Sequence, residues 1–321
     1  MRRNRWKMIA GMLAVILMAG CGEKPETALK ETMVADVSET GDSENGGFQT
    51  TGTEETGVHP GTGSSAPDGN GGSRPSEPIE LTPEETDNDI LALQAAEKKL
   101  FEGKGLEEIE VATVEEFVAL VDNGSINNKR IVLTGESYDF TEGDGINLKN
   151  VSNVEIIGSG STRITADTGY DMVLTIYDSE NILFYGVTMT HNRDDNNKSM
   201  ECGLVLTYNM PELWFVNCEL TGGYLAYSLG DTTLTCINTG LTDCIWQAVV
   251  SMNSTLNFQN CVMDGNGFNN EFMNPLVNAA GSTVNISNTM ISNNTAPSVC
   301  PDSNCVWNEN NVTYQGNSWQ E

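Results

Sequence analysis

A short apolar segment that recurs through the second half of the chain constrains the fold most. Each copy places apolar residues on either side of one variable residue, and successive copies begin 28, 31, 21, 22, 28 and 28 residues apart. The copies begin at Val154, Ile182, Leu213, Leu234, Leu256, Val284 and Val312. Alternating apolar residues indicate strands with one buried face. Their regular recurrence predicts a solenoid, in which each repeat buries its apolar face against its neighbours.

An asparagine stands at a fixed offset after four of these segments, and an apolar residue follows it three positions later. These residues are Asn217, Asn238, Asn260 and Asn288. Asn tolerates the left-handed backbone of a sharp bend and can hydrogen-bond locally. We therefore predict that these four side chains occupy one bend on successive coils and stack as a ladder.

With these repeats, residues 111–321 resemble the right-handed parallel β-helix (pectate-lyase-like) superfamily. The resemblance implies an all-β, single-stranded parallel β-helix of about seven coils. Thr113 to Asp122 has the apolar spacing of a short helix that would cap the first coil. A β-sandwich fits poorly because its strands lack this register of Asn and apolar positions. Residues 89–110 are unassigned, with a helix as one interpretation.

The first twenty residues predict export. Basic residues precede an apolar run from Met8 to Ala19, which is shorter than the roughly 20 residues that a membrane-spanning helix needs. This pattern is typical of a signal peptide. Residues 17–21, Leu-Met-Ala-Gly-Cys, resemble the lipobox of bacterial lipoproteins. The resemblance implies lipidation of Cys21 and a membrane anchor facing outside the cytoplasm, at the cell surface or in the periplasm. An ordinary signal peptide with a chance Cys is the alternative.

Residues 21–88 are rich in Gly, Ser and acidic residues. Such a composition cannot offset the entropy cost of ordering, so we expect a disordered linker between the lipidated Cys and the folded part. The whole chain has a formal net charge of −29. This charge argues against nucleic acid as a partner, because phosphates call for clustered Lys and Arg.

The cysteines after Cys21 give no metal signature, because no pair has CxxC spacing and the chain has only 2 His. An exported location permits disulfides, and Cys300 with Cys305 is the pair most easily closed. The remaining cysteines can equally be small buried apolar residues.

The resemblance implies a protein that binds or cleaves polysaccharide along one outer wall. The catalytic runs of polygalacturonase-like hydrolases and of pectin methylesterases are absent, and Asn238-Thr239-Gly240 lacks the acid of the Asn-Thr-Asp run. Pectate lyases need calcium and a basic residue, whereas no Lys or Arg follows Lys198. Binding is therefore the first interpretation. A lyase or hydrolase with atypical residues, or a structural or adhesive surface protein, are the alternatives.

Carboxylates on a lengthened loop and on two later coils are the candidate catalytic groups. The register places His191 in one column with Gly222 and Asp243, and places Asp264 in the neighbouring column. Glycosidases need two carboxyls ~5–9.5 Å apart, which adjacent coils can supply. The catalytic candidates are Asp194, Asp195, Asp243, Asp264 and His191. The non-catalytic alternative is that the aspartates are solvated turn residues.

Ligand contacts are predicted for two basic and two aromatic residues. Arg193 and Lys198 flank the acidic pair of the loop, where Ca²⁺ is a candidate cofactor although the spacing is not that of an EF-hand. Trp214 and Tyr224 alternate with inward-facing apolar residues and are predicted to face outward. There they would stack on sugars or cover the core.

Overall fold

The computed structural model describes residues 88–140, 145–166, 172–191, 203–270, 274–300 and 305–319. The predicted signal peptide, the predicted lipidation site Cys21 and the predicted linker lie outside these residues. Within them, none of the helices has the length and apolar character needed to cross a membrane.

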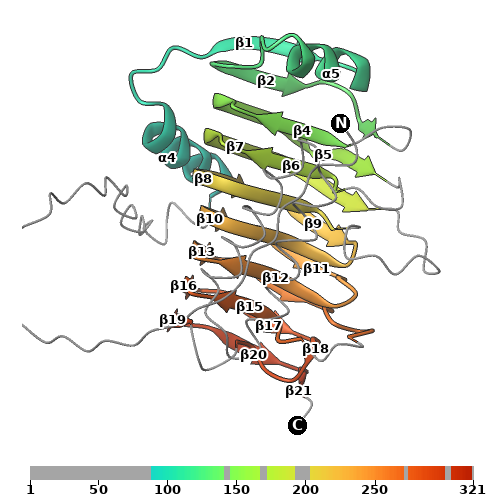
Figure 1. Ribbon diagram of the computed structural model, residues 1–321, viewed down its shortest axis with the longest axis vertical. Helices are drawn as coiled ribbons and strands as arrows, with labels where there is room; N and C mark the ends of the chain where they lie inside the picture. Colours follow the sequence, from blue (N-terminus) through green and yellow to red (C-terminus); the bar gives the residue numbers. More distant parts are fainter. Residues whose placement is uncertain are drawn as a thin grey trace, which may run out of the picture. The chain divides into compact units, whose positions relative to one another are not determined.

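The chain winds as a parallel β-helix whose coils stack along one axis (Figure 1). Three walls form as strands of successive coils pair in parallel. The first wall contains β1 (Glu107–Val111), β2 (Lys129–Leu133), the starts of β5 (Ser152–Ala166) and β7 (Glu180–His191), the ends of β8 (Val205–Val216) and β10 (Leu225–Ile237), β13 (Thr255–Gln259), β16 (Thr283–Ser287) and β19 (Val306–Asn310). The predicted all-β parallel β-helix is confirmed.

The second and third walls complete each coil. The second contains β3 (Ser137–Asp139), the ends of β5 and β7, β9 (Glu219–Gly222), β11 (Gly240–Thr242), β14 (Val262–Asp264), β17 (Met290–Ser292) and β20 (Thr313–Gln315). The third contains β4 (Ile146–Lys149), β6 (Leu174–Tyr177), the starts of β8 and β10, β12 (Gln247–Met252) and β15 (Val277–Ala280). A short pair, β18 (Thr295–Ala296) with β21 (Ser318–Trp319), lies at the last coil.

The sharp bend after the first wall is made by Asn in the left-handed conformation. The predicted residues Asn217, Asn238, Asn260 and Asn288 have φ of 52°, 52°, 54° and 48°. The Asn260 side-chain amide donates to the Asn238 carbonyl oxygen at 2.7 Å, which is one rung of the expected ladder. The bend predicted from the Asn spacing is confirmed, and the ladder is confirmed between Asn238 and Asn260, while the Asn238 amide donates to Asp89 of helix α4 (Asp89–Phe101) instead of to Asn217.

The interior is filled by alternate side chains of each strand, such as Leu256 and Phe258 of β13. The Phe184 and Phe215 rings stack at 5.0 Å with an interplanar angle of 7°. A second ladder, of Asn266, Asn294 and Asn317, lies on the inner side of the coil, and Asn266 and Asn294 are fully buried there. Four cysteines are also buried and act as small packing residues: Cys218, Cys236, Cys244 and Cys261.

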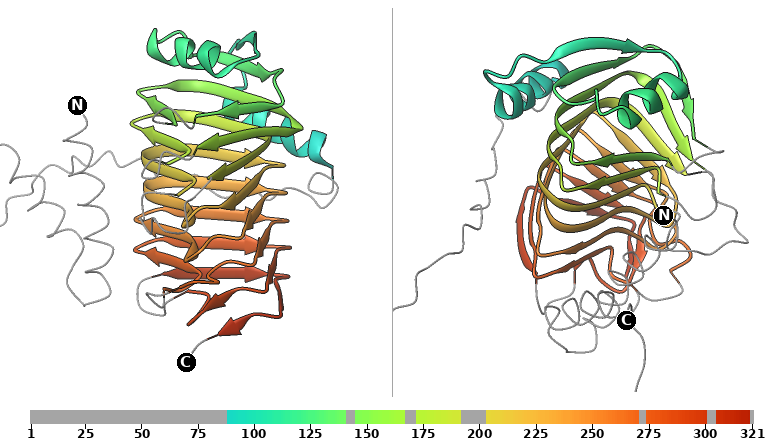
Figure 2. Two further views of the ribbon diagram at one scale, coloured as in Figure 1. Left: turned by 90° about the vertical axis from the view of Figure 1, so that its right-hand side faces the viewer. Right: turned by 45° about the horizontal axis from the view of Figure 1, so that its top comes forward.

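Helix α5 (Val114–Asp122) lies at the N-terminal end of the solenoid (Figure 2). Its first turn is capped from both sides. The hydroxyl of the N-cap residue Thr113 accepts from the Glu116 backbone N–H, and the Glu116 carboxylate accepts from the backbone N–H of Ala112, one residue before the N-cap. Phe117 is buried and meets the Phe140 ring edge-on at 6.4 Å. The capping helix predicted for residues 113–122 is therefore confirmed.

Helix α4 (Asp89–Phe101) lies on the outside of the first wall (Figure 1). It buries an outward-facing apolar strip, which consists of Leu183, Trp214, Val216 and Ile237. Trp214 is only 2% exposed in consequence, and Tyr224 is 1% exposed beside Trp246, with their ring centroids 4.4 Å apart. An exposed sugar platform at Trp214 and Tyr224 is therefore wrong, because both rings are covered by other side chains.

The buried ladder of Asn266, Asn294 and Asn317 should stabilise the fold more than an Asn ladder on the outer surface. Asn294→Ala removes the acceptor of the Asn266 backbone and side-chain N–H groups and the donor to the Met263 carbonyl, all of them buried. We expect the free energy of unfolding to fall by about 2–4 kcal/mol, because each buried polar group left without a hydrogen-bond partner costs about 1–3 kcal/mol.

The matched control is Asn285→Ala. It interrupts a third ladder, of Asn257, Asn285 and Asn308 on the outside of the first wall, at a half-buried position that water reaches. Its cost should stay below about 1 kcal/mol. Urea denaturation followed by circular dichroism measures both, and equal losses would contradict the assignment.

Candidate functional site

A groove on the outside of the second wall is the candidate site. It has a volume of about 450 Å³ and crosses strands β7, β9, β11 and β14. We call it the Glu219 groove. Its lining residues are Gly160, Val187, Thr188, Asn217, Cys218, Glu219, Asn238, Thr239, Gly240, Thr242, Asn260 and Val262. Hydroxyls, amides and one carboxylate therefore meet along successive coils.

The Glu219 carboxylate lies across the next coil rather than out into solvent. The Thr242 hydroxyl donates to Glu219 Oε1 at 2.5 Å. Gly240 pairs with Glu219 in the strand register, and a Cβ at Gly240 would collide with the Glu219 carboxylate. A glycine at this position is thus what lets the carboxylate reach Thr242.

The surroundings of Glu219 favour its protonated form. Burial raises the pKa of Glu219, the hydrogen bond from Thr242 lowers it, and the negative charge of Asp243 raises it again, with a net increase above its ordinary value. A carboxyl with a raised pKa in a groove keeps its proton to higher pH than an ordinary carboxyl and can donate it to a ligand oxygen.

The predicted columns of the second wall are correct. His191 pairs with Gly222, and Thr242 pairs with Thr221 on one side and with Asp264 on the other. Asp264 Oδ1 accepts from the Ser292 hydroxyl at 2.5 Å and from the Asn293 amide at 2.8 Å. Asp264 is therefore held toward the coil after its own, away from Glu219.

The other two predicted residues of these columns differ in exposure. Asp243 is exposed at a left-handed bend with φ of 54°. His191 is buried at 3% exposure and does not line the Glu219 groove. The hypothesis of one cleft shared by His191 and Asp243 is not supported, because only the aspartate reaches the surface.

The candidate loop residues Arg193, Asp194, Asp195 and Lys198 lie outside the described residues. Calcium at the acidic pair therefore stays a prediction. In the described part of the chain, no group of three His, Cys, Asp or Glu residues is arranged to hold a metal ion.

The predicted disulfide is not formed among the described residues, because Cys305 has a free thiol there. Cys300 and Cys305 lie on either side of residues 301–304, which are not described, and both are half-buried against the core.

Glu219 was missed by sequence reasoning, which searched turns and the long loop for acids. Glu219 is instead a strand residue, at the start of β9. The signal available in the sequence was Gly240, a residue without a side chain in the column where Glu219 stands one coil earlier. A long side chain that pairs with a glycine on the next coil has room to extend across that coil.

No protein-family model matches the chain, and no curated protein matches it by sequence. Among solved structures, the chain is similar to a pectate lyase from Bacillus sp. N165 in complex with trigalacturonate, with a TM-score of 0.39 and 11% identity over 66% of this chain and 83% of that one. It is also similar to a variant pectate lyase from Xanthomonas campestris, with a TM-score of 0.39 and 12% identity over 70% of this chain and 83% of that one.

The pKa of Glu219 should respond to its two named neighbours. Asp243→Asn removes a negative charge and should lower the pKa of Glu219, because less repulsion opposes ionisation. Thr242→Val removes the hydrogen bond to the carboxylate and should raise it. Carboxyl ¹³C NMR titration measures both shifts.

Asp178→Asn is the control, because Asp178 lies on a different bend, where it accepts from Asn209. It should leave the Glu219 titration unchanged. Shifts of the same sign in the Asp243 and Thr242 variants would refute the described surroundings.

Proposed function

We propose that this chain is an exported lipoprotein, anchored by a lipid on Cys21, whose β-helix binds polysaccharide of the cell envelope or the surroundings. The Glu219 groove is the observation that carries the binding part of the proposal. The anchor rests on the basic and apolar leader and on the sequence Leu-Met-Ala-Gly-Cys at residues 17–21.

The chemistry of the groove suits sugar hydroxyls. Asn217, Asn238 and Asn260 recur along it at successive bends, together with Thr188 and Thr242. Amides and hydroxyls both donate and accept hydrogen bonds, as sugar hydroxyls do. Because the coils repeat about 4.8 Å apart, the groove offers similar groups at regular intervals to a polymer that also repeats.

The charge of the groove favours a neutral glycan. Among the described residues, those that line the groove include one carboxylate, that of Glu219, and neither Lys nor Arg. A polyuronate would be repelled by a protein of net charge −29, and the groove lining has no basic side chain to pair with its carboxylates. We therefore assign the groove to uncharged polysaccharide.

Glycoside hydrolysis is the second candidate, and the raised pKa of Glu219 favours it. In that reaction a protonated carboxyl gives its proton to the leaving oxygen while a second carboxylate activates water or attacks the sugar. Asp264 is the candidate second carboxylate, since it pairs with Thr242, to which Glu219 is bonded, while its own hydrogen bonds hold it toward the following coil. Because Glu219 and Asp264 stand two coils apart, the strand spacing separates them by on the order of 10 Å, near the upper end of the range that inverting glycosidases use.

A glycan array with the full chain tests the proposal. We expect binding to neutral glycans, and Glu219→Gln should weaken it by up to about tenfold, because the amide loses a hydrogen bond of the carboxyl group and one such bond contributes about 0.5–1.5 kcal/mol. Glu180→Gln, an exposed acid on another wall, is the control and should bind as the wild type does. Failure to bind any neutral glycan would overturn the proposal.

Product analysis on each bound glycan separates the two candidates. Binding without new reducing ends supports a binding protein. Cleavage that both Glu219→Gln and Asp264→Asn abolish supports the hydrolase, with a pH profile that falls as Glu219 loses its proton.

The lipid anchor predicts where the protein is found. Cys21→Ser should abolish palmitate labelling and move the protein from the membrane fraction to the soluble exported fraction, because the thiol is the acylated group. Cys305→Ser keeps Cys21 and serves as the control. Membrane retention of the Cys21 variant would mean that another segment anchors the chain.

A further inference from the structure

A row of side chains on the outside of the first wall changes from charged to apolar beneath helix α4. The strand register places Glu108, Arg130, Glu155, Leu183 and Trp214 side by side on β1, β2, β5, β7 and β8. Helix α4 covers the apolar end of this row with Ala92, Ala96, Leu100 and Phe101. Glu155 thus stands at the boundary, and its side chain is 0% exposed.

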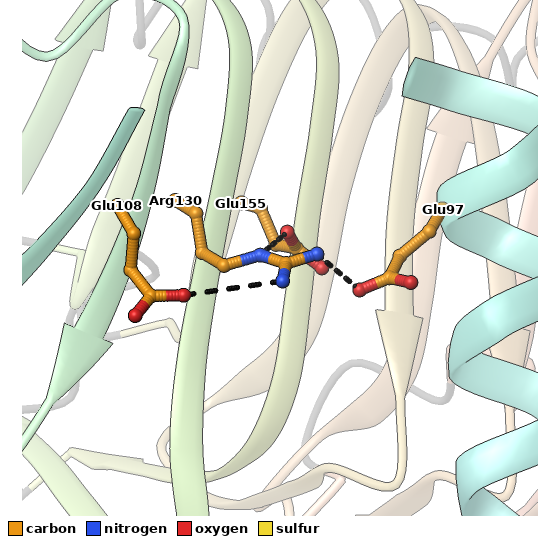
Figure 3. Close-up of polar contacts among 4 residues, drawn as sticks. All are labelled: Glu97, Glu108, Arg130 and Glu155. Atoms are coloured by element: carbon orange, nitrogen blue, oxygen red, sulfur yellow. Dashed lines mark hydrogen bonds and ion pairs between the residues drawn. The ribbon is translucent and has the colours of Figure 1, made fainter. Parts of the chain in front are cut away.

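Arg130 is shared among carboxylates from three different elements (Figure 3). Its Nε donates to Glu155 Oε2 at 2.6 Å, and one terminal nitrogen donates to Glu97 Oε1 of α4 at 2.5 Å. Its other terminal nitrogen lies 4.0 Å from the Glu108 carboxylate. One positive charge therefore faces three acids, two of which, Glu97 and Glu155, meet only when α4 is docked.

The second oxygen of Glu155 has no hydrogen-bond partner among the described residues, although it is buried. An ionised carboxylate in that state carries a large desolvation cost, whereas a protonated one carries much less. The remaining neighbours offer little compensation. Leu183 is apolar, and Lys98 and Lys104 line the adjoining cavity of about 440 Å³ without pairing with Glu155 in any described contact.

We propose that α4 is a proton-controlled clasp, held on the first wall when the Glu97–Glu155 pair shares a proton and loosened when both carboxyls ionise. In the docked state a proton on Glu155 removes the repulsion from Glu97. In the released state Glu155 is exposed to water and ionises as an ordinary carboxyl.

The sign of the pH dependence follows from the surroundings of Glu155. Burial raises the pKa of Glu155, the hydrogen bond from Arg130 lowers it, and the neighbouring Glu97 raises it again, so that the pKa lies at about 7. Because the docked state holds its proton to higher pH than the released state, docking is strongest below the ordinary carboxyl pKa. It weakens as pH rises through about 7.

Docking of α4 sets the point at which the N-terminal part of the chain departs from the surface of the solenoid. Helix α4 stands between residues 1–87 and strand β1 in the sequence. Its first turn is tied to a later coil, since the Asn238 amide donates to Asp89 at 2.8 Å. Release would free thirteen further residues and uncover the strip around Trp214. This inference does not depend on polysaccharide binding by the Glu219 groove.

Hydrogen–deuterium exchange of the full chain, followed by mass spectrometry, tests the clasp. After correction for intrinsic exchange, the opening constant of α4 peptides should rise on the order of tenfold between about pH 5.5 and pH 7.5. Peptides of β13 and β16 should show no such change and report on global unfolding. Unchanged α4 protection, or a parallel loss in β13 and β16, would overturn the proposal.

Glu155→Gln should remove most of this pH dependence, because the amide keeps the shape and cannot ionise. Glu97→Gln removes the opposing carboxyl from the helix side and should reduce the dependence even if the Glu155 variant folds poorly. Glu180→Gln, an exposed acid on β7, is the control and should retain the wild-type response. A full pH response in both the Glu155 and the Glu97 variants would refute the role of the pair.

Discussion

Backbone hydrogen bonds between successive coils are the constraint on which every other feature depends. They fix each strand against its equivalent one coil away, so that a residue's neighbours are set by its column rather than by its own sequence surroundings. The Asn bends maintain this register, because each turns the chain at the same point of its coil, so that the next strand begins beside its equivalent on the neighbouring coil. Glu219 meets Thr242, and Arg130 meets Glu155, only because this phase is kept over many residues.

The sequence allowed the register to be predicted, and with it much of the fold. The spacing of Asn217, Asn238, Asn260 and Asn288 was sufficient to place Thr242 beside Asp264, and the recurring apolar segments placed His191 beside Gly222. The helix that caps the first coil was predicted for a similar reason, because its apolar spacing is local.

What lies on the outside of the walls could not be predicted in this way. Trp214 alternates as an outward residue should, and it does face outward, but α4 covers it. Nothing in the repeat indicates that a segment more than a hundred residues earlier packs there. Glu155 and Glu219 were missed for the same reason, because each appears as an ordinary polar strand residue until its neighbours on other coils are known. In both cases burial of a carboxyl comes from contacts that are distant in sequence.

Helix α4 also changes how the solenoid should lose its structure. In a repeat protein each coil touches only its neighbours, so coils can separate one at a time. Here one helix contacts Arg130 near the start of the stack and Asn238 several coils later. That brace joins the coils beneath it into a single cooperative block, whereas those beyond β10 have only their neighbours and can fray stepwise from the C-terminal end.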